Sequence, residues 1–266
     1  YFEKFTCYID ILLSHAQAID PSVTSRTYRL VAPSEDESVF TYIDSASARA
    51  GITTLSTKLS MRKVAIIGLG GTGSYVLDLV AKTPVKEIHL YDGDIFLPHN
   101  AFRAPGAAPL EELTAQQPKV TYYANIYGNM HRGIIPHELF LSEETVSMLN
   151  GIDFVFLCVD KPSARKTIAS YLIEQRIPFV DAGMEIEHLE DMQCLIGSTR
   201  VTLCTPEKND HYTQHVSLTD GHIEDAYQSN IQVADLNALN ATLAVLKWKK
   251  FCGFYQDCYQ EHQSVY

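Results

Sequence analysis

A glycine-rich loop between a short apolar segment and a helix constrains this chain more than any other feature of its sequence. The continuous apolar run Lys63–Ile67 is typical of a buried parallel strand. The loop GLGGTGS follows at residues 68–74, and apolar periodicity predicts a helix from Tyr75 to Lys82. The glycines fit the pattern G-x-G-x-x-G, which permits a tight turn and brings backbone N–H groups close to phosphate oxygens. No lysine follows the last glycine, so the loop is not a P-loop.

Strands alternate with helices beyond this loop, which indicates parallel βαβ units. We therefore expect an α/β fold, a Rossmann-like open and mostly parallel sheet with helices on both faces. The predicted strands are 86–91, 153–159 and 178–181, the predicted helices are 163–175 and 231–251, and an antiparallel pair is predicted at 192–196 and 199–204, turned at Gly197 and Ser198.

The first part of the chain has a different character and reads as a small N-terminal appendage. An amphipathic start precedes a β-type segment from Thr24 to Ala32, and a short helix is predicted from Ser45 to Leu59. We divide the chain into an appendage, residues 1–44, and a larger domain, residues 45–266. The role of the appendage stays open, and a start without Met leaves open whether a longer chain exists.

Composition excludes several classes of protein. The 266 residues carry 21 Lys and Arg against 32 Asp and Glu, a formal net charge of −11, which disfavours a nucleic-acid partner. No apolar run approaches the roughly 20 residues of a membrane span, and no signal peptide is visible at the start. The six cysteines include no C-x-x-C pair, so neither a disulfide framework nor a zinc site is predicted. We expect a cytoplasmic protein that binds neither nucleic acid nor membrane.

Polar residues along the mouth of the predicted sheet separate ATP from a dinucleotide as ligand. Asp92 ends the second strand and is placed to bind ribose hydroxyls. Asn100, Arg103 and Lys119 follow, and Asp160 comes after the later apolar strand. An NAD enzyme needs no such series. A site that splits ATP between its α- and β-phosphates needs cations on the phosphates and a carboxylate that can hold Mg²⁺.

Five motifs in order resemble the ThiF/MoeB/HesA superfamily, the adenylating core of ubiquitin-activating-type enzymes. They are GLGGTGS at 68–74, DGD at 92–94, N-x-x-R at 100–103, a lysine at 119, and D-x-x-x-x-R at 160–165. The resemblance covers about residues 45–250. It implies ATP and Mg²⁺ as cofactors and a small ubiquitin-like or sulfur-carrier protein, with a C-terminal glycine, as partner. The carboxylate of that glycine would attack the α-phosphate, release pyrophosphate and leave an acyl-adenylate.

The resemblance also implies roles for single residues. The glycine loop would cradle ATP, the acid at 92 would hold the ribose, the arginine and lysine would contact phosphates, and Asp160 would coordinate Mg²⁺. The residues that match the nucleotide pocket are Gly68, Gly70, Gly71, Gly73, Ser74, Asp92, Asp94 and Asn100, and those that match catalytic positions are Arg103, Lys119, Asp160 and an N-terminal arginine.

In the family, that N-terminal arginine reaches the γ-phosphate across a homodimer interface. Arg49 is the candidate here and Arg62 the second choice, and a homodimer is therefore expected. Each residue also has a simpler interpretation. Arg103 could pair with a surface carboxylate, Lys119 could be solvated, and Asp160 could cap the helix that begins near residue 163.

The chain departs from the family in its cysteines. The two C-x-x-C pairs that hold zinc in many relatives are absent. Cys204 lies in roughly the region where many relatives carry a cysteine that takes the activated carboxylate as a thioester. A nucleophilic cysteine needs exposure and a lowered pKa, so an unreactive, semi-buried Cys204 is the alternative.

Three functions remain open from the sequence. The first is an ATP-dependent adenylyltransferase that acts on a protein C-terminus. The second is a non-catalytic nucleotide-binding scaffold of the same fold. The third is an NAD- or FAD-dependent oxidoreductase, for which the chain after Asp181 is short. The protein substrate is not identified by any motif.

Overall fold

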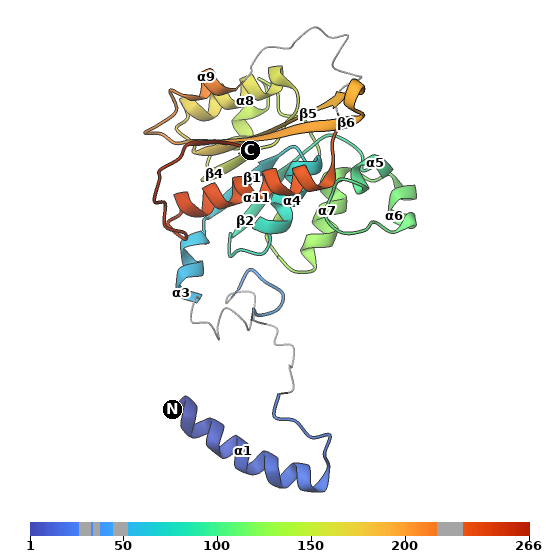
Figure 1. Cartoon of the computed structure of the whole chain (residues 1–266). Helices are drawn as coiled ribbons and strands as arrows, with labels where there is room; N and C mark the ends of the chain where they lie inside the picture. Colours follow the sequence, from blue (N-terminus) through green and yellow to red (C-terminus); the bar gives the residue numbers. More distant parts are fainter. Residues whose placement is uncertain (27–32, 34–37, 45–52, 217–230) are drawn as a thin grey trace.

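The computed structural model describes residues 1–26, 33, 38–44, 53–216 and 231–266, which contain one seven-stranded sheet (Figure 1). The strand order is β3-β2-β1-β4-β5-β6-β7; the first five strands run parallel, and β6 and β7 are antiparallel to their neighbours. The strands are β1 (Lys63–Ile67), β2 (Glu87–Tyr91), β3 (Ile134–His137), β4 (Phe154–Leu157), β5 (Phe179–Leu189), β6 (Cys194–Cys204) and β7 (Gln263–Val265).

Helices cover both faces of this sheet, so the expected α/β fold class is confirmed. One face packs against α4, α7 and α11, and the other packs against α8 and η2. The helices described after residue 52 are α3 (Thr53–Ser56), η1 (Thr57–Leu59), α4 (Gly71–Val80), α5 (Pro98–Ala101), α6 (Leu110–Ala115), α7 (Lys119–Gly128), η2 (Val146–Leu149), α8 (Pro162–Glu174), η3 (Glu190–Met192), α9 (Tyr212–His215) and α11 (Ala234–Phe251).

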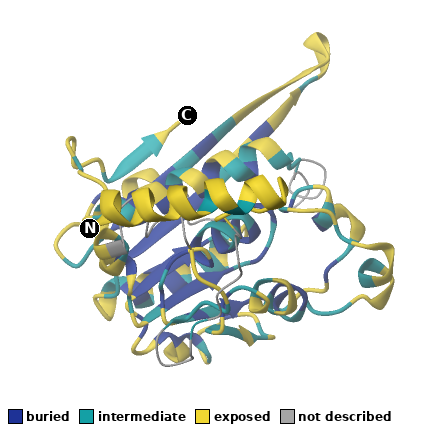
Figure 2. Ribbon diagram, turned by 90° about the horizontal axis from the view of Figure 1, so that it is seen from below, coloured by how far each residue is buried: buried dark blue, intermediate teal, exposed yellow. Residues whose placement is uncertain are grey.

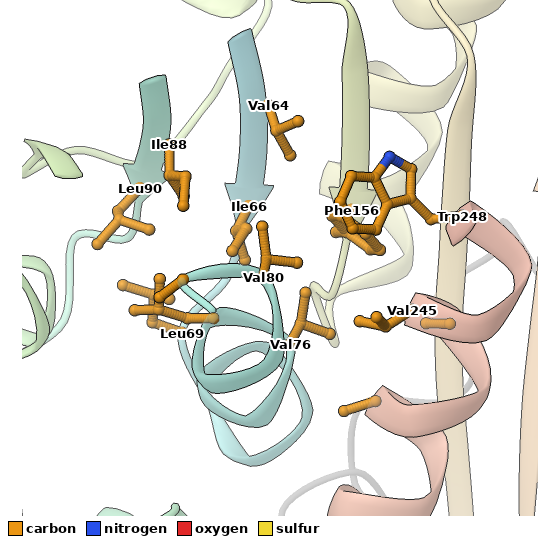
Figure 3. Packing of buried hydrophobic residues seen from close by; sticks show 14 of the residues in the cluster. Val64, Ile66, Leu69, Val76, Val80, Ile88, Leu90, Phe156, Val245 and Trp248 are labelled. Carbon is orange, nitrogen blue, oxygen red and sulfur yellow. The ribbon is translucent and has the colours of Figure 1, made fainter. Parts of the chain in front are cut away.

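Alternate residues of β1 fill the cores on the two faces, as expected for a strand buried on both sides. Val64 and Ile66 point toward α4, where they meet Val76 and Val80 (Figure 3). Ala65 and Ile67 belong to the cluster on the opposite face. Trp248 of α11 is fully buried on the first face. The central strand is thereby fixed on both sides, which holds the loop that follows it.

The strand order places a topological switch point next to β1. The chain after β1 builds β2 and β3 on one side, then returns to build β4 on the other side. Loops at the carboxyl ends of β1 and β4 therefore diverge, and open α/β sheets bind their ligands in the crevice at such a point. The glycine loop, Asp92 and Asp160 all follow the carboxyl ends of parallel strands.

The predicted antiparallel pair at 192–196 and 199–204 is wrong. Residues Cys194–Cys204 form one strand, β6, whose whole length pairs with β5. The reversal occurs at η3, where Gln193 takes a left-handed backbone with φ 49°. Gly197 instead lies opposite Ile186, and a Cβ there would come within 2.5 Å of the Leu236 side chain. This glycine therefore makes room for packing and does not make a turn.

The N-terminal part contains one long helix, α1 (Phe2–Ile19), with no buried residue (Figure 2). Of the predicted β-type segment 24–32, residues 24–26 are not in a strand and the rest lies outside the described residues. Of the predicted helix 45–59, only 53–59 is described, as α3 and η1. Among the helices that the structure describes, none has the length and apolar character needed to cross a membrane.

Candidate functional site

The glycine loop is shaped by close backbone contacts. Gly68 has φ +86°, and a Cβ at this position would lie 2.7 Å from the carbonyl oxygen of Cys158. A Cβ at Gly73 would lie 1.8 Å from the carbonyl oxygen of Gly68. Both positions therefore require glycine so that β1, the loop and the end of β4 can pack together. The hydroxyl of Ser74 is buried and donates to the carbonyl oxygen of Gly71, at 2.8 Å.

Gly70 and Gly71, the two middle glycines of the loop, have different surroundings. Gly71 packs against the side chain of Asn237 on α11: a Cβ added at Gly71 would lie 2.3 Å from Asn237 Cγ. Thr72 beside it donates its hydroxyl to Asn237 Oδ1 at 2.9 Å. At Gly70, by contrast, a Cβ would meet no atom within 4 Å. The protein leaves open space at Gly70, which is the position through which a ligand can approach the backbone.

Asp92 is a buried carboxylate at the end of β2. It accepts hydrogen bonds from the backbone N–H of Leu69, at 2.6 Å, and of Asp94, at 2.8 Å. The Lys119 ammonium lies 3.7 Å from Asp92 Oδ1 and 2.8 Å from Asp94 Oδ2. Burial raises the pKa of the Asp92 carboxyl, and the charge of Lys119 opposes this shift. Lys119 is itself buried, so its interpretation as a solvated lysine is not supported.

Asn100 and Arg103 bring two unpartnered donors to the same region. Asn100 is buried, and its Oδ1 accepts the N–H of Leu97 at 2.9 Å. Its Nδ2 is buried without a hydrogen-bond partner, and so is Arg103 Nε. Burial lowers the pKa of the Arg103 guanidinium, while the carboxylates of Asp160 and Asp94 oppose the shift. Buried donors without acceptors are rare in native proteins, and here they fit a ligand with anionic oxygens.

Asp160 stands exposed in the loop that follows β4. It is near enough to Arg103 to influence the pKa of that guanidinium. The interpretation of Asp160 as a helix cap is not supported, because the N-cap of α8 is Lys161 and no side-chain cap hydrogen bond forms there. The carboxylate is therefore free of a capping role.

The two candidate N-terminal arginines are not part of this arrangement. Arg49 lies outside the described residues. Arg62 is exposed and directly precedes β1. It therefore lies at the amino end of this strand, whereas the glycine loop follows its carboxyl end. Arg62 therefore cannot reach the glycine loop of its own chain.

Cys204 is a poor nucleophile in this structure. It is 1% exposed, lies in β6 opposite Phe179, and its thiol pKa is raised to about 12 by burial. A reactive cysteine needs the opposite environment, an exposed thiolate near positive charge. The unreactive alternative therefore describes Cys204 better in this structure.

Several residues near the site escaped sequence reasoning. Asn237 and Asn240 of α11 contact Thr72 and Gly183, far away in sequence. Asp181 is fully buried between Arg165 and Arg200. Of these residues, only Asp181 could have been noticed in the sequence, because it ends a predicted strand in the same way as Asp92.

Family models match both parts of the chain. The ThiF family model matches residues 45–252, and a domain of unknown function (DUF6791) matches residues 1–45. A ubiquitin-like modifier-activating enzyme 5 from Culex quinquefasciatus is 25% identical over 152 residues, covering 52% of this chain and 38% of that enzyme.

Solved structures show a similar fold. Escherichia coli MccB with succinimide has a TM-score of 0.62 at 17% identity, covering 79% of this chain and 62% of MccB. MccB with ATP has a TM-score of 0.58 at 20% identity, and the match covers 77% of this chain and 60% of MccB. PaaA has a TM-score of 0.61 at 15% identity, and the match covers 96% of this chain and 80% of PaaA. The chain thus spans 38% of the length of the modifier-activating enzyme and 60–62% of the length of MccB. Since the ThiF model covers most of its length, the chain belongs to the ThiF family.

Proposed function

We propose that this chain binds ATP with Mg²⁺ and adenylates the C-terminal carboxylate of a protein or peptide. The observation that carries the proposal is the pair of buried, unpartnered donors, Asn100 Nδ2 and Arg103 Nε. Arg103 is close enough to Asp94, the ion-pair partner of Lys119, for that carboxylate to influence its pKa. Lys119 also lies beside Asp92, which accepts a hydrogen bond from the glycine loop at Leu69, and that loop has open space at Gly70. A polyphosphate supplies acceptor oxygens for such donors and the negative charge that the cations require.

The remaining residues fit the other parts of ATP. The Asp92 carboxylate uses one lone pair on each oxygen for a backbone N–H, so further acceptor capacity remains for a ribose hydroxyl. The N-terminus of α4, which begins at Gly71, offers backbone N–H groups and a favourable dipole to phosphate. MccB, which shares this fold, has been solved with ATP, in agreement with the proposal.

Asp160 is the proposed Mg²⁺ ligand. Among the described residues no group of three or more His, Cys, Asp or Glu side chains could hold a metal. Mg²⁺ does not need one, since it keeps several waters and binds through one or two carboxylates together with substrate phosphates. When bound, the ion would neutralise phosphate charge. The exposed Asp160 carboxylate near Arg103 is suited to such shared coordination.

The chain's own residues would act by position and charge. A terminal carboxylate has a pKa of about 3.5, so it is ionised at neutral pH and needs no general base. One of its oxygens forms a bond to the α-phosphorus, the bond to the bridging oxygen breaks, and pyrophosphate leaves with that electron pair. Arg103 and Lys119 would hold the phosphate oxygens in line and stabilise the charge that moves onto the leaving group.

The partner is proposed to be a small ubiquitin-like or sulfur-carrier protein ending in glycine. The similarity to a ubiquitin-like modifier-activating enzyme supports a protein substrate, and MccB, which shares this fold, has been solved together with MccA. A homodimer in which Arg49 reaches the partner's phosphate site belongs to the same proposal. The six free cysteines fit a reducing compartment such as the cytoplasm.

Calorimetric titration with Mg-ATP, and with NADH in a parallel cell, tests the proposal. We expect micromolar binding of ATP, weakened about tenfold by Asp160→Ala, and no binding of NADH. NADH binding without ATP binding would instead favour an oxidoreductase. ATP–pyrophosphate exchange with candidate proteins ending in glycine then separates an enzyme from a nucleotide-binding scaffold, which would bind ATP and exchange nothing.

A further inference from the structure

A buried ionic network lies beside the loop that carries Asp160. Asp181 has no exposed surface, and its two oxygens contact three side chains. Arg200 Nη2 donates to Oδ1 at 2.6 Å, the Tyr212 hydroxyl donates to Oδ2 at 3.0 Å, and Arg165 Nε lies 3.2 Å from Oδ2. A fully buried carboxylate needs such partners, because an unpaired charge in the interior is strongly destabilising.

Arg165 has a second contact, which reaches the nucleotide site. Its Nη2 donates to the carbonyl oxygen of Val159 at 2.5 Å. Val159 is the residue immediately before Asp160. The guanidinium therefore joins the rigid carboxylate of Asp181 to the backbone from which the Asp160 side chain extends.

The same backbone also lies against the glycine loop. A Cβ at Gly68 would lie 2.7 Å from the carbonyl oxygen of Cys158 and 3.3 Å from the backbone nitrogen of Val159. The Cys158 N–H also donates to the carbonyl oxygen of Ile67 at 2.8 Å. Cys158 and Val159, the two residues before Asp160, thus lie against the glycine loop, and the carbonyl oxygen of Val159 also accepts a hydrogen bond from Arg165.

We propose that Arg165 is a positioning residue: held by Asp181, it fixes the backbone at Val159 and so aims the Asp160 carboxylate toward the phosphate site. The inference rests on the proposed function of Asp160 as Mg²⁺ ligand. A guanidinium suits this task because its planar fork faces two acceptors in fixed geometry, which an ammonium cannot do. Here Nη2 donates a hydrogen bond to the Val159 carbonyl oxygen, and Nε lies within ion-pair distance of Asp181 without a hydrogen bond to it. An exposed carboxylate on an unsupported loop would sample many positions, and a metal ligand must be held within a fraction of an ångström.

Arg200 provides a matched control. It shares Asp181 with Arg165, and its Nη1 donates to Thr202 Oγ1 at 3.0 Å. Its guanidinium lies over Gly183, where a Cβ would come within 2.5 Å of Nη2. None of its described contacts is with the loop at 158–160. Arg165→Gln and Arg200→Gln each leave Asp181 with one guanidinium and the Tyr212 hydroxyl, so the two variants disturb the network to a similar extent.

The test is the effect of Mg²⁺ on ATP affinity, measured by calorimetry in excess MgCl₂ and in EDTA. Thermal unfolding without ligand checks the fold of each variant. We expect Mg²⁺ to strengthen ATP binding to the wild type and to Arg200→Gln equally, and to have little effect on Asp160→Asn. For Arg165→Gln we expect the strengthening to fall about tenfold, the usual loss when an outer partner of a metal ligand is removed. ATP affinity in EDTA should stay close to the wild-type value.

Each other result contradicts the proposal in a distinct way. If Arg165→Gln keeps the full effect of Mg²⁺ while Asp160→Asn loses it, Asp160 binds the ion but Arg165 does not position it. If both arginine variants lose the effect equally, the network serves only to fold the protein. If the wild type shows no effect of Mg²⁺, the proposed metal role of Asp160 fails as well. Should Arg165→Gln not fold, Arg165→Lys, which keeps the charge and loses the fork, is measured in the same way with the same expectation.

Discussion

The Lys119 ammonium lies 2.8 Å from the carboxylate of Asp94 and 3.7 Å from the buried carboxylate of Asp92, so one lysine forms ion pairs with both acids. Lys119→Met would leave Asp92 buried without its counter-charge. We expect the free energy of unfolding, measured in urea, to fall by about 2 kcal/mol, the usual cost of a buried polar group that loses its partner. ATP affinity should fall about tenfold or more, because the proposed contact with a phosphate is also lost.

Lys82→Met is the control for this prediction. Lys82 pairs with Asp78 at 2.8 Å, but its side chain is 50% exposed. Exposed ion pairs contribute little, so the unfolding free energy should change by less than about 0.5 kcal/mol. Equal losses in the two variants would show that the buried position of Lys119 has no special energetic role.

Alanine substitutions in the glycine loop should separate folding from binding. Gly73→Ala would place a Cβ 1.8 Å from a backbone oxygen, so we expect a loss of about 2 kcal/mol or more in unfolding free energy. Gly70→Ala meets no protein atom within 4 Å and should fold normally. Its added methyl group occupies the approach to the loop, so ATP affinity measured by calorimetry should drop. A Gly70→Ala protein with wild-type affinity would show that ATP does not approach the loop there.

Two histidines at the sheet edge should make stability depend on pH. His89 Nδ1 and His137 Nε2 lie 3.0 Å apart, and burial lowers the pKa of both imidazoles below the ordinary value of 6.5. The folded protein therefore binds fewer protons than the unfolded chain. The stability from the neutral pair is fully present above pH 6.5 and is lost as the pH falls toward the lowered pKa values.

Urea unfolding between neutral and mildly acidic pH checks this sign. We expect His89→Gln, His137→Gln and the double variant to flatten the pH profile in part, since His99, His131 and His211 also have lowered pKa values. A double variant that keeps the wild-type slope would assign the dependence to other groups.

Cysteine alkylation should follow exposure. Cys7, Cys194 and Cys258 are exposed, whereas burial raises the pKa of the Cys204 thiol to about 12. Iodoacetamide at mildly alkaline pH should label the three exposed cysteines first and leave Cys204 unmodified in the folded protein, as read by peptide mass spectrometry. Cys204→Ala should retain ATP–pyrophosphate exchange. Early labelling of Cys204 would return it to the list of nucleophile candidates.

The fold was predictable where one local pattern decides the structure. The apolar run of β1, the glycines after it and the strand ending at Tyr91 each have a signature within about ten residues, so their positions agreed with the structure within a few residues. Gly197 shows where this reasoning fails. A glycine next to a serine is typical of a turn, but this glycine lies mid-strand because Leu236 of a distant helix packs over it. The residues that neighbour Gly197 in the sequence do not reveal this contact.

The site was predictable in a similar, partial way. Asp92, Asn100, Arg103 and Lys119 lie within one motif-rich stretch. In the structure Asp92 accepts the N–H of Leu69 in the glycine loop, Lys119 lies beside Asp92, and Arg103 is near Asp94. Asp181 and Arg200 were missed because their function depends on the pairing of β5 with β6, whose register no local pattern reveals. The environment of Cys204 was also inaccessible, since burial is a property of the assembled sheet.

The contact between Thr72 and Asn237 has a consequence for the order in which the molecule can mature. The two residues are 165 positions apart, and Asn237 fills the space against Gly71 at the start of α4. During synthesis the glycine loop leaves the ribosome long before α11 does. The loop can reach its packed form only after that helix has been made, so for a long interval the nascent chain carries the glycine loop without the contact that shapes it.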